Sequence, residues 1–249
     1  MTLPTISTKI NLPPLRRNVV PRQRLVARLD AALQPGIRLV LISAPAGFGK
    51  STLAAHWAHQ LQAGGQWGAA WLALDEQDNQ LARCFHYLVA SAQKVAPGLG
   101  QAIQEILALP RPVNVEGLVT DLVNQLAVLP QPLVVILDDY HHLQDTAIRE
   151  AMNLLLEHLP QGVRLVVLTR EDPPFALARL RARGQMVEIR AIDLRFTAAE
   201  ADEFLNHWMG LDLAPQAIQR LDARTEGWIA GLQMAALSMR GRSDLDGFI

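Results

Sequence analysis

Residues 37–57 read IRLVLISAPAGFGKSTLAAHW, and this stretch decides the fold. Its centre has a small residue, four residues of any kind and then Gly-Lys-Ser, the pattern of a phosphate-binding loop or Walker A motif. Glycines let successive backbone N–H groups turn inward as an anion-binding nest, and the positive end of the following helix points at the same anion. We expect these residues to bind a nucleotide: Ala44, Pro45, Ala46, Gly47, Phe48, Gly49, Lys50, Ser51 and Thr52.

The sequence on both sides of the loop supports this interpretation. Residues 39–42 form a continuous apolar run, which is typical of a parallel strand covered on both faces. After the loop, the spacing of apolar residues becomes helical. The alternative is a Gly-rich turn that binds no ligand. The order of strand, turn and helix favours the nucleotide interpretation, because a turn without a ligand would not need it. We expect Lys50 to place its charge over the β- and γ-phosphates, and Ser51 to ligate Mg²⁺.

The composition is that of a folded domain without a strong charge. Hydrophobic residues make up 50% of the 249 residues and charged residues 19%, which allows a large core and argues against disorder. The net charge of −1 provides no basic excess for nucleic-acid binding. Cys84 is the single cysteine, so no internal disulfide can form. The sequence shows no signal peptide and its apolar runs are too short for a bilayer, so we expect a cytoplasmic protein without a membrane partner.

Strand-like and helix-like patterns alternate along most of the chain. Further strands are expected at residues 69–74, 133–139, 163–169 and 186–190. The alternation predicts an α/β fold of the P-loop NTPase type, with a five-stranded parallel sheet covered by helices on both faces.

After the last expected strand, the pattern is only helical. Helices are expected over 197–209, 214–225 and 227–240, and Thr197 with Glu200 forms a capping box at the start of the first. We expect three parts: an extended proline-rich leader over 1–21, a P-loop ATPase domain over 22–193 and a small helical region over 194–249.

Residues 133–139, LVVILDD, have the form of a Walker B strand. The apolar run would carry the chain through the core to the carboxyl edge of the sheet, where ligands bind in open α/β folds. There Asp138 would ligate Mg²⁺, and Asp139 would orient or deprotonate the water that attacks the γ-phosphate. A strand that simply ends in an Asp-rich turn is the alternative. The phosphate-binding loop upstream favours the nucleotide interpretation.

The next strand ends in Thr169 and Arg170 at the same edge. A polar residue here can sense the γ-phosphate, and an arginine can stabilise the charge that develops on it. Arg170 is therefore a candidate catalytic residue. The alternative is a surface arginine that pairs with Glu171 or Asp172.

Other charged and titratable clusters receive no catalytic role. The acidic run at residues 75–79 follows a strand, and we expect it in a loop near the nucleotide. A solvated helix face is expected for Arg179, Arg181 and Arg183. The rings of the adjacent His141 and His142 should point away from each other, and without HExxH spacing we expect no zinc site. No Asn-Lys-x-Asp element for reading guanine occurs, so adenine is the expected base.

The ordered set of motifs resembles the ATPase domain of the MalT-like large LuxR-family transcriptional regulators, which belong to the STAND class of P-loop NTPases. The resemblance runs over nearly the whole chain. It is carried by Lys9–Ile10, 20–25 (VPRQRL), 43–52, 71–79 (WLALDEQDN), 137–143 (LDDYHHL), 167–170 (VLTR), 194–197 (LRFT) with Glu200, and 226–232 (EGWIAGL).

The resemblance implies a regulatory switch that uses ATP, ADP and Mg²⁺. An ADP-bound resting form would be monomeric, inducer and ATP together would favour an oligomer that binds DNA, and hydrolysis would reset the switch. Inducer and DNA would bind only through regions absent from this chain, and we expect a truncated chain because residues 246–249 carry no stop signal.

The resemblance also assigns residues to the nucleotide. Val20 and Arg22 would contact adenine, and the helical region would close over the nucleotide. Trp228 is expected to fill the core between the helices rather than to contact the nucleotide.

Two other function classes use the same loop. A small-molecule kinase would need an acceptor pocket and an arginine-rich lid, for which residues 171–185 are the candidate. A scaffold would hold nucleotide without turnover, and the presence of both Asp138 and Asp139 argues against it. We expect a weak ATPase that serves regulation.

Overall fold

The computed structural model describes residues 4–15, 19–109 and 113–240. At its centre lies a five-stranded sheet with the strand order β2-β3-β4-β1-β5. The strands are β1 (Leu39–Ser43), β2 (Gly68–Ala73), β3 (Leu133–Asp138), β4 (Val163–Thr169) and β5 (Met186–Arg190). Every neighbouring pair is parallel. The predicted five-stranded parallel sheet is confirmed.

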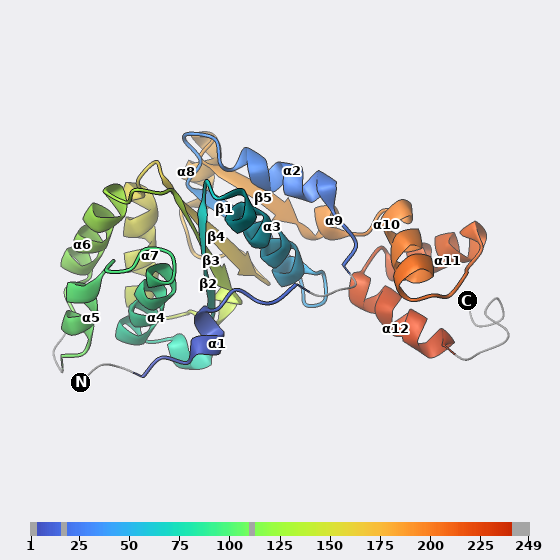
Figure 1. The fold of residues 1–249 in the computed structure, drawn as a ribbon, viewed down its shortest axis with the longest axis horizontal. Coiled ribbons are helices and arrows are strands. Elements are labelled where there is room, and N and C mark those ends of the chain that lie inside the picture. Colours follow the sequence, from blue (N-terminus) through green and yellow to red (C-terminus); the bar gives the residue numbers. More distant parts are fainter. Residues whose placement is uncertain (1–3, 16–18, 110–112, 241–249) are drawn as a thin grey trace.

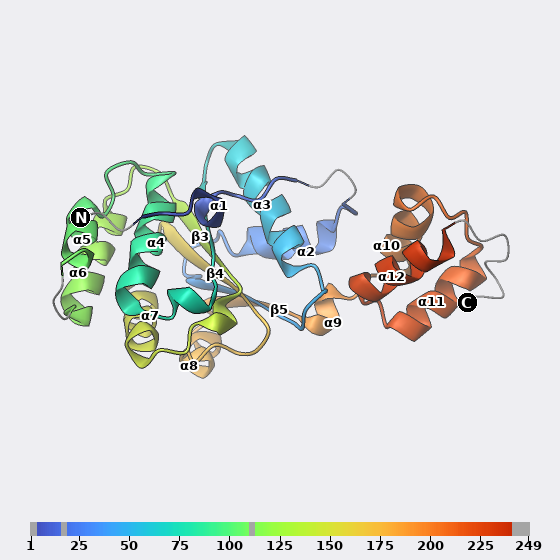
Figure 2. The same cartoon turned by 90° about the horizontal axis from the view of Figure 1, so that it is seen from below.

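Helices cover both faces of the sheet, as Figures 1 and 2 show. On one face, strand residues such as Val40 and Ile136 pack against α2 (Gln23–Ala31) and α3 (Lys50–Gly64). On the other face, residues such as Leu41 and Val135 share a core with α4 (Leu81–Gln93), α5 (Gln101–Leu107), α6 (Val115–Ala127), α7 (Thr146–His158) and α8 (Leu177–Ala182). Successive side chains of a strand point to opposite faces. The inner strands β1, β3 and β4 are therefore buried on both sides, which explains their continuous apolar runs, whereas the edge strand β5 is only partly buried.

The chain after β5 is helical, as predicted. It forms α9 (Ala191–Leu194), α10 (Ala198–Asp202), η3 (Glu203–Trp208), α11 (Pro215–Thr225) and α12 (Ile229–Met239). The predicted capping box is present, since the Glu200 N–H donates to Thr197 Oγ1 and the Thr197 N–H donates to the Glu200 carboxylate. The single helix expected over 197–209 changes to π-helical winding in η3, which apolar spacing does not reveal.

The helical region has its own core and stands beside one end of the sheet (Figure 1). Leu194 packs into the core under the sheet, whereas Phe196 packs into the core of the helical region. The predicted boundary at 193/194 stays a prediction, and residues 241–249 with the predicted truncation lie outside the described residues. Among the described helices, none has both the length and the apolar character needed to cross a membrane.

The leader is not extended throughout, contrary to the prediction. In its described part, Ser7–Ile10 form the short helix α1 against the edge strand β2. The Lys9 ammonium binds the carboxylates of Asp75 and Asp78, and Asp78 is fully buried. Because these partners lie far apart in the sequence, local spacing does not predict the helix.

Residues 75–79 form a turn after β2, next to the end of β3, and their predicted place near the nucleotide stays a prediction. These residues follow the edge strand β2 and include the turn η1 (Glu76–Asp78). Asp78 binds both Lys9 and Arg83. None of residues 75–79 lines the cavity at the P-loop. The acidic run fixes α1 and α4 to the edge of the sheet.

Candidate functional site

A cavity of about 820 Å³ lies between the P-loop and the helical region. Small-molecule sites typically have volumes of about 300–1,000 Å³. The cavity is lined by Val19, Val20, Arg22, Ala46, Gly47, Gly49, Lys50, Ser51, Thr52, Leu53, His56, Asp139, Arg170, Phe196, Phe204, Met209, Ile229, Ala230 and Gln233. Most of the predicted site residues therefore meet at one place, although Ala44, Pro45, Phe48 and Asp138 do not line it.

The P-loop joins β1 to α3 and presents unpaired backbone donors. Gly47 and Gly49 have left-handed φ angles of 79° and 80°, which glycine adopts without a steric penalty. Across the described part of the chain, the backbone N–H groups of residues 46–52 find no hydrogen-bond acceptor. With the N-terminus of α3 beside them, these groups form an anion-binding surface.

Lys50, at the start of α3, is buried at the base of the cavity. Its Nζ donates to the carbonyl oxygens of Ala44 at 2.8 Å and Pro45 at 3.0 Å. Burial lowers the pKa of Lys50, while the carboxylates of Asp139 and Asp138 act in the opposite direction. The ammonium group is thus held against the same loop that carries the unpaired N–H donors.

Ser51 and Asp138 meet behind the P-loop. The Ser51 hydroxyl donates to Asp138 Oδ1 at 2.9 Å. The contact follows from the strand order, because only β4 separates β1 from β3 and all three strands end at the same edge. Burial raises the pKa of the Asp138 carboxyl to about 6. A hydroxyl and a carboxylate are the oxygen ligands that Mg²⁺ prefers, so this pair fits the ion.

Asp139 directly follows the end of β3, and its backbone leaves the extended conformation of the strand. Its φ is 56°, in the left-handed region that non-glycine residues rarely adopt. The side chain is 44% exposed and lines the cavity. Such backbone conformations persist where the surrounding structure imposes them, often at functional sites.

The turn η2 (Tyr140–His142) follows Asp139 directly. The prediction that the two histidine rings point away from each other is wrong, because this short turn brings their centroids within 4.4 Å. His141 Nδ1 lies 3.8 Å from Asp139 Oδ1. Within the described ranges, no group of three or more His, Cys, Asp or Glu residues is arranged to hold a metal ion.

Arg170 lies at the end of β4, between the P-loop strand and β3. It forms no hydrogen bond or ion pair with the described residues, and Asp172 pairs with Arg190 instead. The alternative of a surface arginine paired with Asp172 is therefore not what the structure shows. Thr169 is fully buried, and its hydroxyl donates to the Glu171 carbonyl oxygen rather than facing the cavity.

The leader forms another wall of the cavity. Val20 packs into the core of the helical region. The Arg22 guanidinium donates to the carbonyl oxygens of Leu194 at 2.8 Å and Arg195 at 2.7 Å, and it pairs with Glu200 at 3.1 Å. Arg22 thereby ties the leader to the helical region. Adenine contact by Val20 and Arg22 stays a prediction.

The sequence reasoning missed most of the wall that the helical region contributes. Phe196, Phe204, Met209 and Ile229 line the cavity with apolar surface. Their helical spacing looks the same as that of core residues. Gln233 is the polar side chain that this region adds. No local sequence signal distinguishes these cavity-lining residues from residues that are buried in the core.

Trp228 does not fill the core between the helices, contrary to the prediction. It is partly exposed, and its indole N–H donates to the Ala46 carbonyl oxygen of the P-loop at 3.1 Å. The distinctive tryptophan of the helical region therefore contacts the loop itself.

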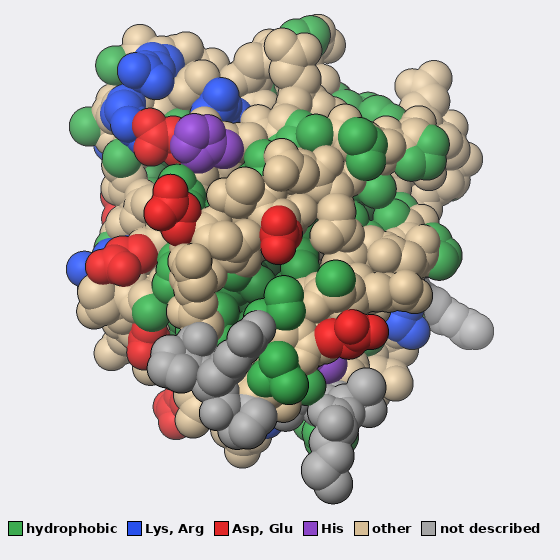
Figure 3. Space-filling view, turned by 90° about the vertical axis from the view of Figure 1, so that its left-hand side faces the viewer, with side chains coloured by type: hydrophobic (Ala, Val, Ile, Leu, Met, Phe, Trp, Pro, Cys, Tyr) green, Lys and Arg blue, Asp and Glu red, His purple; other side chains and the backbone are tan. Residues whose placement is uncertain are grey.

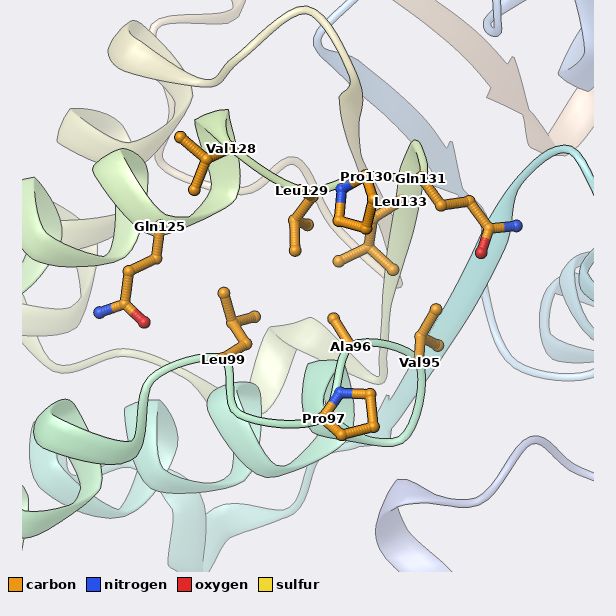
Figure 4. A pocket seen from close by; sticks show the side chains of 10 residues that line it. All are labelled: Val95, Ala96, Pro97, Leu99, Gln125, Val128, Leu129, Pro130, Gln131 and Leu133. Carbon is orange, nitrogen blue, oxygen red and sulfur yellow. The ribbon is translucent and has the colours of Figure 1, made fainter.

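A second cavity, of about 350 Å³, has a different character. It lies between residues 95–99 and 125–133, at the amino end of β3, and Figure 4 shows its mainly apolar lining. Its two amide side chains are already engaged, since Gln125 accepts from the Gly100 N–H and Gln131 donates to the Gly65 carbonyl oxygen. The neighbouring end of the molecule carries hydrophobic side chains interspersed with acidic and basic ones (Figure 3). Without a cationic side chain, the second cavity does not suit a phosphate.

Comparison with known proteins agrees with this geometry. Residues 18–168 match the family described as AAA ATPase domain. The chain belongs to this family. The chain is 38% identical over 236 residues to the HTH-type transcriptional regulator MalT of Cronobacter sakazakii, and 36% identical over 235 residues to that of Serratia proteamaculans. Each match covers 94% of this chain and 25% of the relative, so the chain spans about a quarter of their length.

The fold of the AAA ATPase domain is similar to that of solved P-loop proteins. Cdc6p from Pyrobaculum aerophilum gives a TM-score of 0.53 at 13% identity, covering 91% of this chain and 65% of that one. Drosophila ORC bound to DNA gives a TM-score of 0.51 at 15% identity, covering 90% and 58%. At such identities the likeness shows the fold alone. Together, the family match and the relatives confirm the resemblance predicted from the motifs.

Proposed function

We propose that this AAA ATPase domain binds an adenine nucleotide with Mg²⁺ and acts as a regulatory switch. The observation that carries the proposal is the convergence of Lys50, Ser51, Asp139 and Arg170 on one cavity. Unpaired P-loop N–H groups lie in the same place. The names of the relatives, which are transcriptional regulators, support a regulatory role.

Each element of the cavity has a role in this proposal. The P-loop N–H groups and Lys50 bind the phosphates. Ser51 and Asp138 hold Mg²⁺, which when bound neutralises phosphate charge. Asp139 orients the attacking water, and Arg170 stabilises the charge that develops on the γ-phosphate. Val19, Val20 and Arg22 on one side and the apolar side chains of the helical region on the other hold the base.

The switch would depend on the γ-phosphate. A ligand shifts a conformational equilibrium only by its difference in affinity for the two states. ADP would favour the resting form, and ATP with an inducer would favour self-association, until slow hydrolysis restores ADP. Inducer and DNA would bind to parts of a longer protein outside this chain.

The position of the arginine-rich segment argues against a small-molecule kinase. Arg179, Arg181 and Arg183 are exposed, as expected for a solvated helix face, and none of them lines the cavity. Arg179 pairs with Glu157, and Arg181 pairs with Glu188. The segment therefore does not stand over the P-loop as a kinase lid would.

Calorimetric titration with ADP and with ATP plus Mg²⁺ tests nucleotide binding. Lys50→Ala removes a charge-assisted contact to phosphate, and we expect it to weaken binding by about 10- to 100-fold or more. Lys94→Ala removes an exposed lysine far from the cavity and serves as the matched control, with unchanged affinity. Equal affinities for the wild type and Lys50→Ala would refute the proposed site.

A further inference from the structure

Two hydrogen bonds join the start of α12 to the P-loop. The Trp228 indole N–H donates to the Ala46 carbonyl oxygen at 3.1 Å, and the Ala230 backbone N–H donates to the Gly47 carbonyl oxygen at 3.2 Å. Trp228 is the residue that immediately precedes α12. The helical region therefore binds two successive carbonyl groups of the phosphate-binding loop.

These bonds fix the direction of the loop's own N–H groups. The described peptide bonds are all trans, and in a planar trans peptide the C=O and N–H groups point in opposite directions. With the Ala46 and Gly47 carbonyl groups directed at α12, the N–H groups of Gly47 and Phe48 point away from it. Both belong to the run of N–H groups without a protein acceptor. The contact thus holds two donors of the anion-binding surface in position.

The contact leaves no room for a side chain at Gly47. A Cβ atom there would lie 2.7 Å from Ala230 Cβ and 2.8 Å from Trp228 Nε1. Gly49 has a similar φ, but a Cβ there would meet only Ile229 Cγ2, at 3.8 Å. The glycine at position 47 is therefore required by the docking of α12 as well as by the backbone angle.

The turn before Trp228 is itself fixed. Gly227 has a φ of 68°, and a Cβ there would lie 2.8 Å from the Phe196 carbonyl oxygen. The Phe196 N–H donates to the Gly227 carbonyl oxygen at 2.9 Å. Because Phe196 also lines the cavity, the segment that carries the indole is attached to the cavity wall.

We propose that Trp228 is a positioning residue for the P-loop, whose indole N–H holds the Ala46–Gly47 peptide in the orientation that binds the phosphates of a nucleoside diphosphate or triphosphate. The inference rests on the proposed nucleotide site. Phosphate binding and the docking of α12 are then linked, and by reciprocity each strengthens the other. Trp228 touches the loop and not the reacting atoms.

Trp228→Phe tests this role because it keeps a ring and removes the N–H. Trp208→Phe is the matched control, since the Trp208 indole N–H in the same region is buried and has no acceptor among the described residues. One neutral hydrogen bond contributes about 1 kcal/mol, so we expect Trp228→Phe to weaken ADP binding about 5- to 10-fold in calorimetry. Trp208→Phe should leave the affinity within about twofold of the wild type.

A spectroscopic readout separates positioning from a general loss of structure. The chain has five tryptophans, and with 5-fluorotryptophan the Trp228 ¹⁹F resonance is assigned by its loss in Trp228→Phe. In the otherwise unchanged protein, ADP should shift this resonance more than that of Trp208. No shift at Trp228, or equal ADP affinities for Trp228→Phe and Trp208→Phe, would overturn the inference while leaving the nucleotide site intact. A wild-type protein that binds no ADP would overturn both.

Discussion

The two sides of the cavity at the P-loop are built in different ways. The α/β core supplies Asp139 and Arg170, which directly follow β3 and β4, and Lys50 and Ser51, which begin α3 after the loop that follows β1. The helical region supplies mainly apolar surface and two N–H groups that bind the loop. Charged chemistry therefore comes from the sheet, whereas enclosure comes from the docked helices.

This difference shows what positions the residues on each side of the cavity. On the core side, the register of the parallel strands places the charged residues, because all strands end at one edge. On the helical side, position depends on a few contacts such as those of Trp228 and Arg22. Substitutions in the α/β core should mainly affect ATP hydrolysis and protein stability. Substitutions where the helical region meets the P-loop should affect nucleotide binding and the packing of α12 on the loop.

The largest effect should come from Asp139→Ala, on the core side. Loss of the residue proposed to orient the attacking water should lower ATP hydrolysis by about 10²- to 10⁴-fold while ATP binding persists. Phosphate release and calorimetry measure the two properties separately. Asp172→Ala provides a carboxylate control outside the cavity, with turnover unchanged. Normal turnover in Asp139→Ala would remove the role assigned to this residue.

The next largest effect should come from the buried ion pair between Lys9 and Asp78, which attaches the leader to the α/β core. Lys9→Met leaves the fully buried Asp78 with one cationic partner fewer, and breaking a buried ion pair typically costs about 3–5 kcal/mol. We expect the free energy of unfolding in urea to fall by about 3 kcal/mol. Arg179→Met breaks an exposed pair with Glu157, which solvent screens, and should leave the free energy of unfolding nearly unchanged. Similar losses for both variants would contradict the structural role of Lys9.

A pH-dependent effect should follow from Asp138. Burial raises the pKa of this carboxyl from 3.8 to about 6, so the folded protein binds the proton more tightly than the unfolded chain does. Stability contributed by Asp138 is therefore present below pH 4 and is lost as the pH rises towards 6. Without Mg²⁺ at pH 7.5, Asp138→Asn should be more stable than the wild type by up to about 3 kcal/mol. The difference should vanish near pH 4, and a difference independent of pH would contradict this prediction.

The smallest effect tests the junction itself. Gly47→Ala and Gly49→Ala both place a side chain at a left-handed φ, which costs about 1–2 kcal/mol. Only the new Cβ at position 47 collides with Ala230 and Trp228. Denaturation should therefore show that Gly47→Ala loses about 1–3 kcal/mol more than Gly49→Ala. Equal losses would mean that α12 does not pack on the loop as described.

Much of the core side could be predicted from the sequence. The bounds of β4 and β5 agree with the predicted 163–169 and 186–190. For β4 this follows because an apolar run buried on both faces begins and ends abruptly. The P-loop and Asp139, which the motifs single out, lie at one cavity, since each motif combines a backbone requirement with a chemical one. These features are local, so a short window of sequence contains the information.

The parts that were missed depend on contacts between distant segments. Lys9 looked like part of an extended leader because Asp75 and Asp78 lie more than 60 residues away. Phe204 and Met209 looked like ordinary core residues, although they line the cavity. Trp228 meets Ala46 across 182 positions of the sequence. Hydrophobic spacing shows that such residues face inward but not which surface they meet.

The central claim is that the cavity between the core and the helical region holds an adenine nucleotide. The most direct measurement is to extract and identify, by chromatography, the nucleotide that stays with the purified wild-type protein through gel filtration, with Lys50→Ala in parallel. The account predicts ADP close to one equivalent in the wild type and none in Lys50→Ala. A wild-type protein that carries no nucleotide, and takes up neither ADP nor ATP with Mg²⁺ when they are added, would contradict the account.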